Sequence, residues 1–299
     1  MFRWRVGFWR QHRLIVDVPF YLDVTLCCGQ VFRWNKVDNW WYGVVDDKAF
    51  KVRQLGNLVE FENVEWPFIL NYFSLDVDLQ KIGAKINKDP HIGKALKEYF
   101  GLRLIRQDPW ECLISYICAT YKSIPAIRHM LNNMAQKFGE KTSLDGREFY
   151  NFPKPKALAK ATEQDLKACG LGYRSKYVFS ATRRICKEGV DLEALRQLPY
   201  MEAKQTLMEL PGVGAKVADC VLLFSLGKTE AFPVDVWVKR VILNHYADKL
   251  TPELFHRLSA HSSLSSPDYR RLSEFGRSYF GEYAGYAQEY LYHYERITL

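Results

Sequence analysis

The residues best suited to do chemistry are a lysine and an aspartate in the stretch 206–240. Lys216 follows a glycine-rich turn at an expected helix start, and Asp235 follows a proline and can cap the next helix, residues 236–245. A free lysine, with a pKa of ~10.4, is almost wholly protonated at neutral pH, but burial and a helix N-terminus both favour the neutral amine. Such an amine could form a Schiff base, and a nearby carboxylate could stabilise a cationic sugar-like transition state.

The elements that must position this pair form a helix–hairpin–helix over about residues 203–226. The hairpin reads Pro211-Gly212-Val213-Gly214, and apolar residues recur at helical spacing on both sides of it. Glycines allow a tight turn, and the amide groups at the following helix start can approach an anion closely. We therefore expect Gly212, Val213 and Gly214 to bind DNA phosphates without reading bases. A simpler alternative is that Lys216 only binds phosphate and Asp235 only caps its helix.

Composition favours a globular protein with a polyanionic partner. The chain has 299 residues, is 48% hydrophobic and carries a net charge of +8, with a pI of about 9.0. Its 44 Phe, Tyr and Trp (18, 18 and 8) are expected mostly in the core, but some could stack on an unpaired base. Seven cysteines without a CxxC pair indicate a reducing compartment. No apolar run has the length of a membrane span, so no membrane association is expected.

The pattern along the chain predicts an α+β fold. Residues 1–105 are expected to form an antiparallel twisted sheet domain with helices, and residues 106–299 an all-helical body of two subdomains. The basic start, residues 1–13, is interpreted as a first strand or arm. Short β-rich runs separated by turn residues predict the strands, at residues 14–16, 21–26, 31–34, 40–45, 50–52 and 58–61.

Several motifs, in order, make the chain resemble the 8-oxoguanine DNA glycosylases of the helix–hairpin–helix Gly/Pro-Asp superfamily. The central run is LPGVGAKVADC followed by PVDV; the others are CGQVFRW at 28–34, LIRQDPWEC at 104–112, GLGYR at 170–174 and YAGYAQ at 283–288. The resemblance implies a bifunctional DNA glycosylase/AP lyase with Lys216 and Asp235 as catalytic residues. It also implies double-stranded DNA containing 8-oxoguanine as partner, no cofactor or metal, and a monomer. No cysteine follows Cys220, so the iron–sulfur cluster of the related endonuclease III branch is not expected.

The resemblance also implies a pocket for a flipped base. The Gly29 carbonyl would recognise the N7 hydrogen that oxidised guanine has and guanine lacks, and Gln288 would read the pairing edge. Cys220 and Tyr292 would contact the two faces of the base, with Phe224 in the wall. The alternatives are an ordinary strand glycine or a bulge at 29 and plain core packing for Cys220, Phe224 and Tyr292. Asp219 is interpreted as a structural or solvent-facing residue.

The chain departs from the family pattern where the orphaned cytosine and the backbone are held. The family's asparagine run is absent from residues 117–123, and one of two cytosine-reading arginines is Ala126. Arg174 remains, Tyr173 matches the wedge that fills the vacated stack, and Trp237 replaces a phosphate-contacting histidine. We therefore expect Tyr173, Arg174 and Trp237 at the DNA surface, with weak discrimination of the opposite base.

Two other functions remain open on the sequence alone. One is a glycosylase of the same superfamily for another damaged base, and the other is a non-enzymatic helix–hairpin–helix DNA-binding protein. A DNA repair enzyme would lie in the cytoplasm with the nucleoid in a prokaryote, or in the nucleus of a eukaryote.

Overall fold

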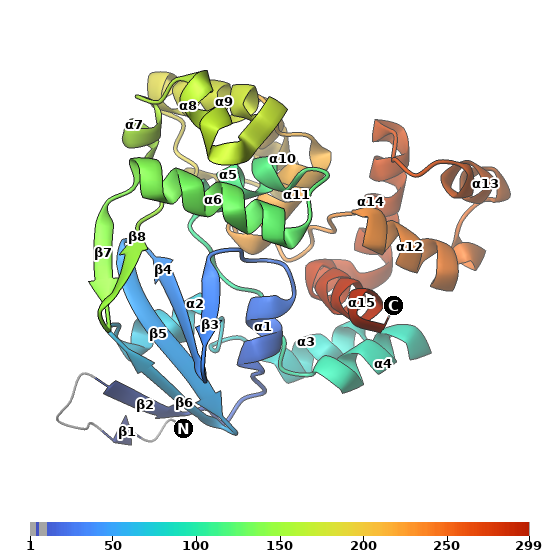
Figure 1. The fold of residues 1–299 in the computed structure, drawn as a ribbon. Helices are drawn as coiled ribbons and strands as arrows, with labels where there is room; N and C mark the ends of the chain where they lie inside the picture. The colour runs from blue at the N-terminus through green and yellow to red at the C-terminus, as the bar shows by residue number, and fades with distance from the viewer. Residues whose placement is uncertain (1–3, 6–10, 299) are drawn as a thin grey trace.

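The computed structural model describes residues 4–5 and 11–298 and confirms the predicted α+β fold. An antiparallel sheet is followed by a helical body (Figure 1). The sheet order is β1-β2-β6-β5-β4-β3. The strands are β1 Trp4–Arg5, β2 Gln11–Ile15, β3 Trp34–Val37, β4 Trp40–Val45, β5 Lys48–Leu55 and β6 Leu58–Glu62. Most of the predicted basic arm lies outside the described residues.

Turn chemistry explains the central hairpin of the sheet. Asp46 and Asp47, between β4 and β5, have φ angles of 48° and 63°. Two successive left-handed residues make the two-residue turn whose twist matches that of the strands it joins. The register that follows pairs Val45 with Lys48 and Gly43 with Phe50.

One predicted strand was wrong, and one was misplaced. Residues 21–26 fall largely in a helix, α1 Leu22–Cys27, which buries Leu22 and residues 24–26. The Leu22 amide, free at the helix start, donates to Oε1 of Gln54 at 2.7 Å, and this partner is too distant in sequence to be foreseen. The predicted strand 31–34 begins only at Trp34.

The remaining helices lie after the sheet strands. In the first third they are α2 Trp66–Tyr72, α3 Leu79–Ile86 and α4 Pro90–Tyr99. The body contains α5 Pro109–Ala119, α6 Ile124–Phe138, α7 Pro155–Leu158, α8 Glu163–Leu166, α9 Ser175–Glu188, α10 Tyr200–Met208, α11 Ala215–Phe224, α12 Val236–His245, α13 Pro252–Ala260, α14 Ser266–Phe280 and α15 Ala284–Thr298. A two-stranded sheet, β7 Lys141–Leu144 with β8 Arg147–Tyr150, interrupts the helices, so the body is not all-helical as predicted.

Two apolar cores hold the fold together. One lies under the sheet and includes Leu14, Trp34 and Phe61, and the other fills the helical body. Apolar side chains of α3 and α4 belong to the second core, although these helices precede the predicted boundary at 105/106, which stays a prediction. In Figure 1 α15 lies between α12 and the α3–α4 pair, in agreement with its packing on both. Within the described residues, no helix is both long and apolar enough to span a membrane.

Candidate active site

The predicted helix–hairpin–helix is formed by α10, the turn 209–214 and α11. Gly212 has a φ of 83°, and a Cβ atom there would lie 2.6 Å from Cβ of Tyr177. Only glycine fits both the left-handed conformation and this close approach. The Val213 amide donates to the Leu210 carbonyl at 3.1 Å, and exposed Gly214 is the N-cap of α11. The amides at the start of α11 therefore stay free of side-chain caps, as an anion-binding helix start requires.

Lys216 and Asp235 both line the same cavity and the same groove. Lys216 lies in the first turn of α11, and Asp235 caps α12 by accepting from the amides of Trp237 and Val238, each at 2.9 Å. Both line a cavity of about 100 Å³ and a larger groove of about 680 Å³ outside it. An amine and a carboxylate from two helix starts thus border the passage from groove to cavity.

Burial and nearby positive charge have opposite effects on the pKa of the Asp235 carboxyl. Burial raises the pKa of its carboxyl, while the Lys216 ammonium and the two amides of α12 act in the opposite direction. Its surface is partly open to the groove, yet protein atoms surround most of it. A carboxylate desolvated in this way acts more strongly on a developing positive charge than one in bulk water.

All five predicted base-binding residues line the 100 Å³ cavity. Gly29, Cys220, Phe224, Gln288 and Tyr292 come from the loop after α1, from α11 and from α15. Gln288 is 5% exposed, and its Oε1 has no hydrogen-bond partner among the described residues. A buried amide oxygen without a partner is costly, so this cavity is suited to a ligand that donates a hydrogen bond.

One part of the cavity wall is apolar and formed by an aromatic pair and a cysteine. Phe224 stacks on Tyr116 at 5.6 Å between ring centroids with an interplanar angle of 10°. Cys220 is buried, and burial raises the pKa of its thiol, so it remains a neutral group in contact with the cavity. A flat aromatic wall and an uncharged sulfur suit the faces of a planar base.

Comparison with known proteins matches this architecture over nearly the whole chain. Residues 13–113 match the family described as 8-oxoguanine DNA glycosylase, N-terminal domain, and residues 114–271 match the HhH-GPD superfamily base excision DNA repair protein. The N-glycosylase/DNA lyase OGG1 of Arabidopsis thaliana is 32% identical over 91% of this chain and 76% of its own length. The chain belongs to the 8-oxoguanine DNA glycosylase family.

A solved structure and a further relative are also similar to this chain over most of its length. The Clostridium acetobutylicum 8-oxoguanine glycosylase/lyase, in complex with double-stranded DNA containing cytosine opposite 8-oxoG, is similar with a TM-score of 0.89 and 32% identity, covering 100% of this chain and 98% of that one. A probable N-glycosylase/DNA lyase of Methanothermobacter thermautotrophicus is 33% identical over 75% of this chain and 72% of its own.

The predicted DNA-facing residues of this glycosylase lie beside the hairpin. Tyr173 is 53% exposed and borders a second groove of about 640 Å³ with Gly212, Val213 and Gly214. Trp237 lines the main groove. Arg174 is only 3% exposed, and its guanidinium donates to the Thr120 carbonyl.

Two polar residues next to predicted ones were not foreseen. Gln30 is fully buried: its Oε1 accepts from the Ile105 amide at 2.8 Å and its Nε2 donates to the Arg103 carbonyl at 2.7 Å, which fixes the loop that carries Gly29. Glu289 lines the cavity beside Gln288, with its Oε1 unpartnered among the described residues. Burial raises the pKa of Glu289 to about 7. A charged residue adjacent to YAGYAQ was the only sequence signal for it.

Asp219 has a structural role. It is fully buried and accepts from the hydroxyls of Tyr200 and Tyr269, both at 2.6 Å, and from Nζ of Lys204 at 2.8 Å. This network joins α10, α11 and α14 behind the hairpin. The structural interpretation was therefore right and the solvent-facing alternative wrong.

Proposed function

We propose that this protein is a bifunctional DNA glycosylase/AP lyase that excises 8-oxoguanine from duplex DNA. The observation that carries the proposal is the single cavity lined by Lys216, Asp235 and all five predicted base-binding residues, opening beside a groove bordered by the hairpin. The printed names of the relatives, N-glycosylase/DNA lyase and 8-oxoguanine glycosylase/lyase, agree with it. The enzyme acts where its DNA lies: in the nucleoid of a prokaryotic cell or the nucleus of a eukaryotic one.

Duplex DNA is held by its backbone. The hairpin Gly212-Val213-Gly214, whose turn the Val213 amide closes onto the Leu210 carbonyl, brings the backbone amides at the start of α11 to the phosphate. Exposed Tyr173 fills the stack that the flipped nucleotide leaves. Trp237, on the wall of the groove, offers one hydrogen-bond donor and a stacking face but no charge. Arg174 supports the wedge, because its guanidinium lies 4.4 Å from the centre of the Tyr173 ring.

The base is read inside the cavity. The Gly29 carbonyl accepts the N7 hydrogen of 8-oxoguanine, and unmodified guanine, which presents an acceptor at N7, leaves that carbonyl unpaired. The buried Gln288 amide, whose oxygen lacks a partner, takes a donor on the pairing edge. Because the cavity is small, the base enters as the Tyr292 side chain moves away from Gly29, and the base then lies between Tyr292 and Cys220.

The chemistry uses the amine and the carboxylate. After the Lys216 ammonium gives a proton to water, its nitrogen bonds to C1′ as the glycosidic bond breaks; the bonding electron pair leaves with the base, which takes up a proton from water, and Asp235 stabilises the positive charge on the sugar. Ring opening gives a protonated Schiff base between Lys216 and C1′. Loss of a C2′ proton then expels the 3′ phosphate by β-elimination, which nicks the strand on the 3′ side.

Parallel excision assays test the substrate. Matched duplexes carrying 8-oxoguanine, an oxidised pyrimidine, 3-methyladenine or undamaged guanine are incubated with the enzyme, and released bases are quantified. Preferential release of 8-oxoguanine supports the proposal. Preferential release of another base would support the alternative glycosylase. No release from any duplex, with DNA binding retained, would support a non-enzymatic DNA-binding protein.

A further inference from the structure

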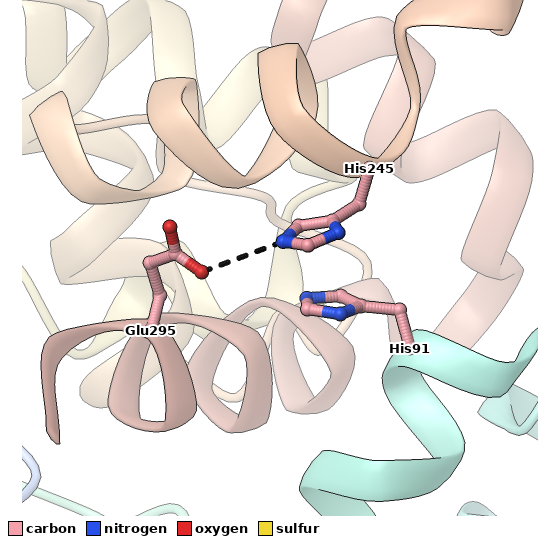
Figure 2. A group of neighbouring side chains, drawn as sticks. All are labelled: His91, His245 and Glu295. Carbon is pink, nitrogen blue, oxygen red and sulfur yellow. Dashed lines mark ion pairs between the residues drawn. The ribbon is translucent and has the colours of Figure 1, made fainter. Parts of the chain in front are cut away.

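Three side chains from three helices converge near the C-terminal end of α15, about two turns beyond Gln288. His91 lies in the first turn of α4, His245 is the last residue of α12, and Glu295 lies near the end of α15. Their nitrogen and oxygen ligand atoms all lie within 4.8 Å of one another (Figure 2). Over the described part of the chain, neither the cavity nor the main groove is lined by any of the three.

Neighbouring side chains hold the carboxylate of Glu295 in place. Oε2 of Glu295 lies 3.6 Å from Nε2 of His245, while Oε1 lies 3.5 Å from Nε of Arg240 and 3.4 Å from Nδ2 of Asn244. Glu295 is only 3% exposed. One oxygen is thus occupied by neighbours and the other is directed to the histidines, the arrangement by which surrounding groups orient a metal-binding carboxylate.

The histidines carry the second observation. Nε2 of His91 is buried and has no hydrogen-bond partner among the described residues. The two imidazole rings are stacked, with centroids 3.5 Å apart and an interplanar angle of 16°. A buried imidazole nitrogen without a hydrogen-bond partner is available to bind a metal ion.

We propose that His91, His245 and Glu295 bind a divalent transition-metal ion, with zinc as the best match. Two imidazoles and one carboxylate are a known zinc ligand set, and bonds of about 2.0–2.2 Å in a tetrahedron place ligand atoms about 3.3 Å apart. The present separations need only a small contraction and a turn of one ring, because parallel rings do not yet direct their lone pairs at one point. A water molecule takes the fourth position.

A metal ion at this site would hold together the helices that position the proposed active site. The helix α12 begins at the cap Asp235 and ends at His245, and α15 carries Gln288 and Tyr292 as well as Glu295. Asp89, the cap of α4, accepts from the His91 amide and from the hydroxyls of Tyr246 and Tyr279, so the start of α4 is already pinned to this region. A bound ion therefore fixes α12 and α15 against α4, and binding stabilises the folded chain.

The test uses the full chain without a histidine tag, stripped with EDTA. Zinc is titrated by calorimetry, and cobalt(II) serves as a spectroscopic probe. We expect one ion per chain, a cobalt spectrum of tetrahedral nitrogen and oxygen ligands, and a melting temperature about 4 °C higher at a zinc concentration a hundredfold above the dissociation constant.

Variants assign the ligands. His91→Ala and the near-isosteric Glu295→Gln should each weaken zinc binding at least a hundredfold, and exposed His256→Ala should not. Circular dichroism confirms that each variant is folded. Equal zinc binding by wild type and both variants, or a cobalt spectrum with thiolate charge transfer from exposed Cys27 or Cys186, would overturn the proposal. So would the absence of any binding by folded wild-type protein.

Discussion

The hydroxyl oxygen of Tyr292 lies 3.2 Å from the position that a Cβ atom on Gly29 would occupy. The same position lies 3.0 Å from Nη1 of Arg296, and Gly29 itself has a φ of 104°. The glycine that is proposed to read N7 and the tyrosine that is proposed to stack on the base therefore lie close together in the lining of the cavity. Any side chain at position 29 occupies space that the base needs.

The first prediction concerns Gly29→Ala. The added methyl group strains the left-handed backbone and crowds Tyr292, so we expect 8-oxoguanine excision to fall at least a hundredfold. Borohydride trapping on a preformed abasic site should persist, because that reaction needs no base pocket. Gly56→Ala is the matched control, since Gly56 has a φ of 62° but no atom within 4 Å of its added Cβ. Equal loss of both reactions in Gly29→Ala would contradict the pocket assignment.

The second prediction separates the two roles of Asp235. Asparagine can still cap α12, so Asp235→Asn should fold with a nearly unchanged melting temperature. It cannot stabilise positive charge, and single-turnover excision should fall about 10²–10³-fold. Wild-type excision should also decline on acidification, because burial raises the pKa of the Asp235 carboxyl and the protonated form is inactive. An Asp235→Asn enzyme with wild-type excision would mean that the residue is only a cap.

The third prediction is weak discrimination of the base opposite the lesion. Arg174 is committed to the Thr120 carbonyl, and the second arginine of the family pattern is Ala126. Each missing bidentate contact removes about 1–3 kcal/mol of discrimination. Excision rates with cytosine, adenine, guanine or thymine opposite 8-oxoguanine should therefore agree within about tenfold. A cytosine preference above a hundredfold would refute this expectation.

The fourth prediction is that Glu289 lowers the free energy of unfolding at high pH. Burial raises its pKa from 4.5 to about 7, so the folded protein retains a proton that the unfolded chain releases. Stability contributed by this group is full below pH 4.5 and is lost as pH rises through 7. At about 1.4 kcal/mol per pKa unit, the difference between 4.5 and about 7 lowers the free energy of unfolding by roughly 3 kcal/mol at high pH.

Glu289→Gln should therefore raise the free energy of unfolding relative to wild type at pH 8 and leave it nearly unchanged at pH 4.5. Urea denaturation at both pH values measures the difference, with exposed Glu98→Gln as control. A stability gain of the same size at both pH values would show that the ionisation of Glu289 is not its cause.

Local signals predicted the parts of the site that depend on backbone geometry. The Pro–Asp cap gave the bounds of α12, residues 236–245, and the hairpin glycines gave the turn before Lys216. What the residues could not give alone was convergence: Gly29 and Gln288 lie far apart in sequence, and only the family resemblance suggested that they meet. Glu289 and the Gln54 partner of α1 depend on tertiary neighbours, and no local pattern marks such contacts.

Borohydride trapping tests the central claim, that Lys216 forms a Schiff base with the sugar. Wild-type enzyme and a duplex containing 8-oxoguanine are mixed with sodium borohydride, and the adduct is mapped by peptide mass spectrometry. We predict a covalent protein–DNA adduct on Lys216 that Lys216→Gln abolishes while duplex binding remains. An adduct on another residue, or an undiminished adduct in Lys216→Gln, would contradict the account.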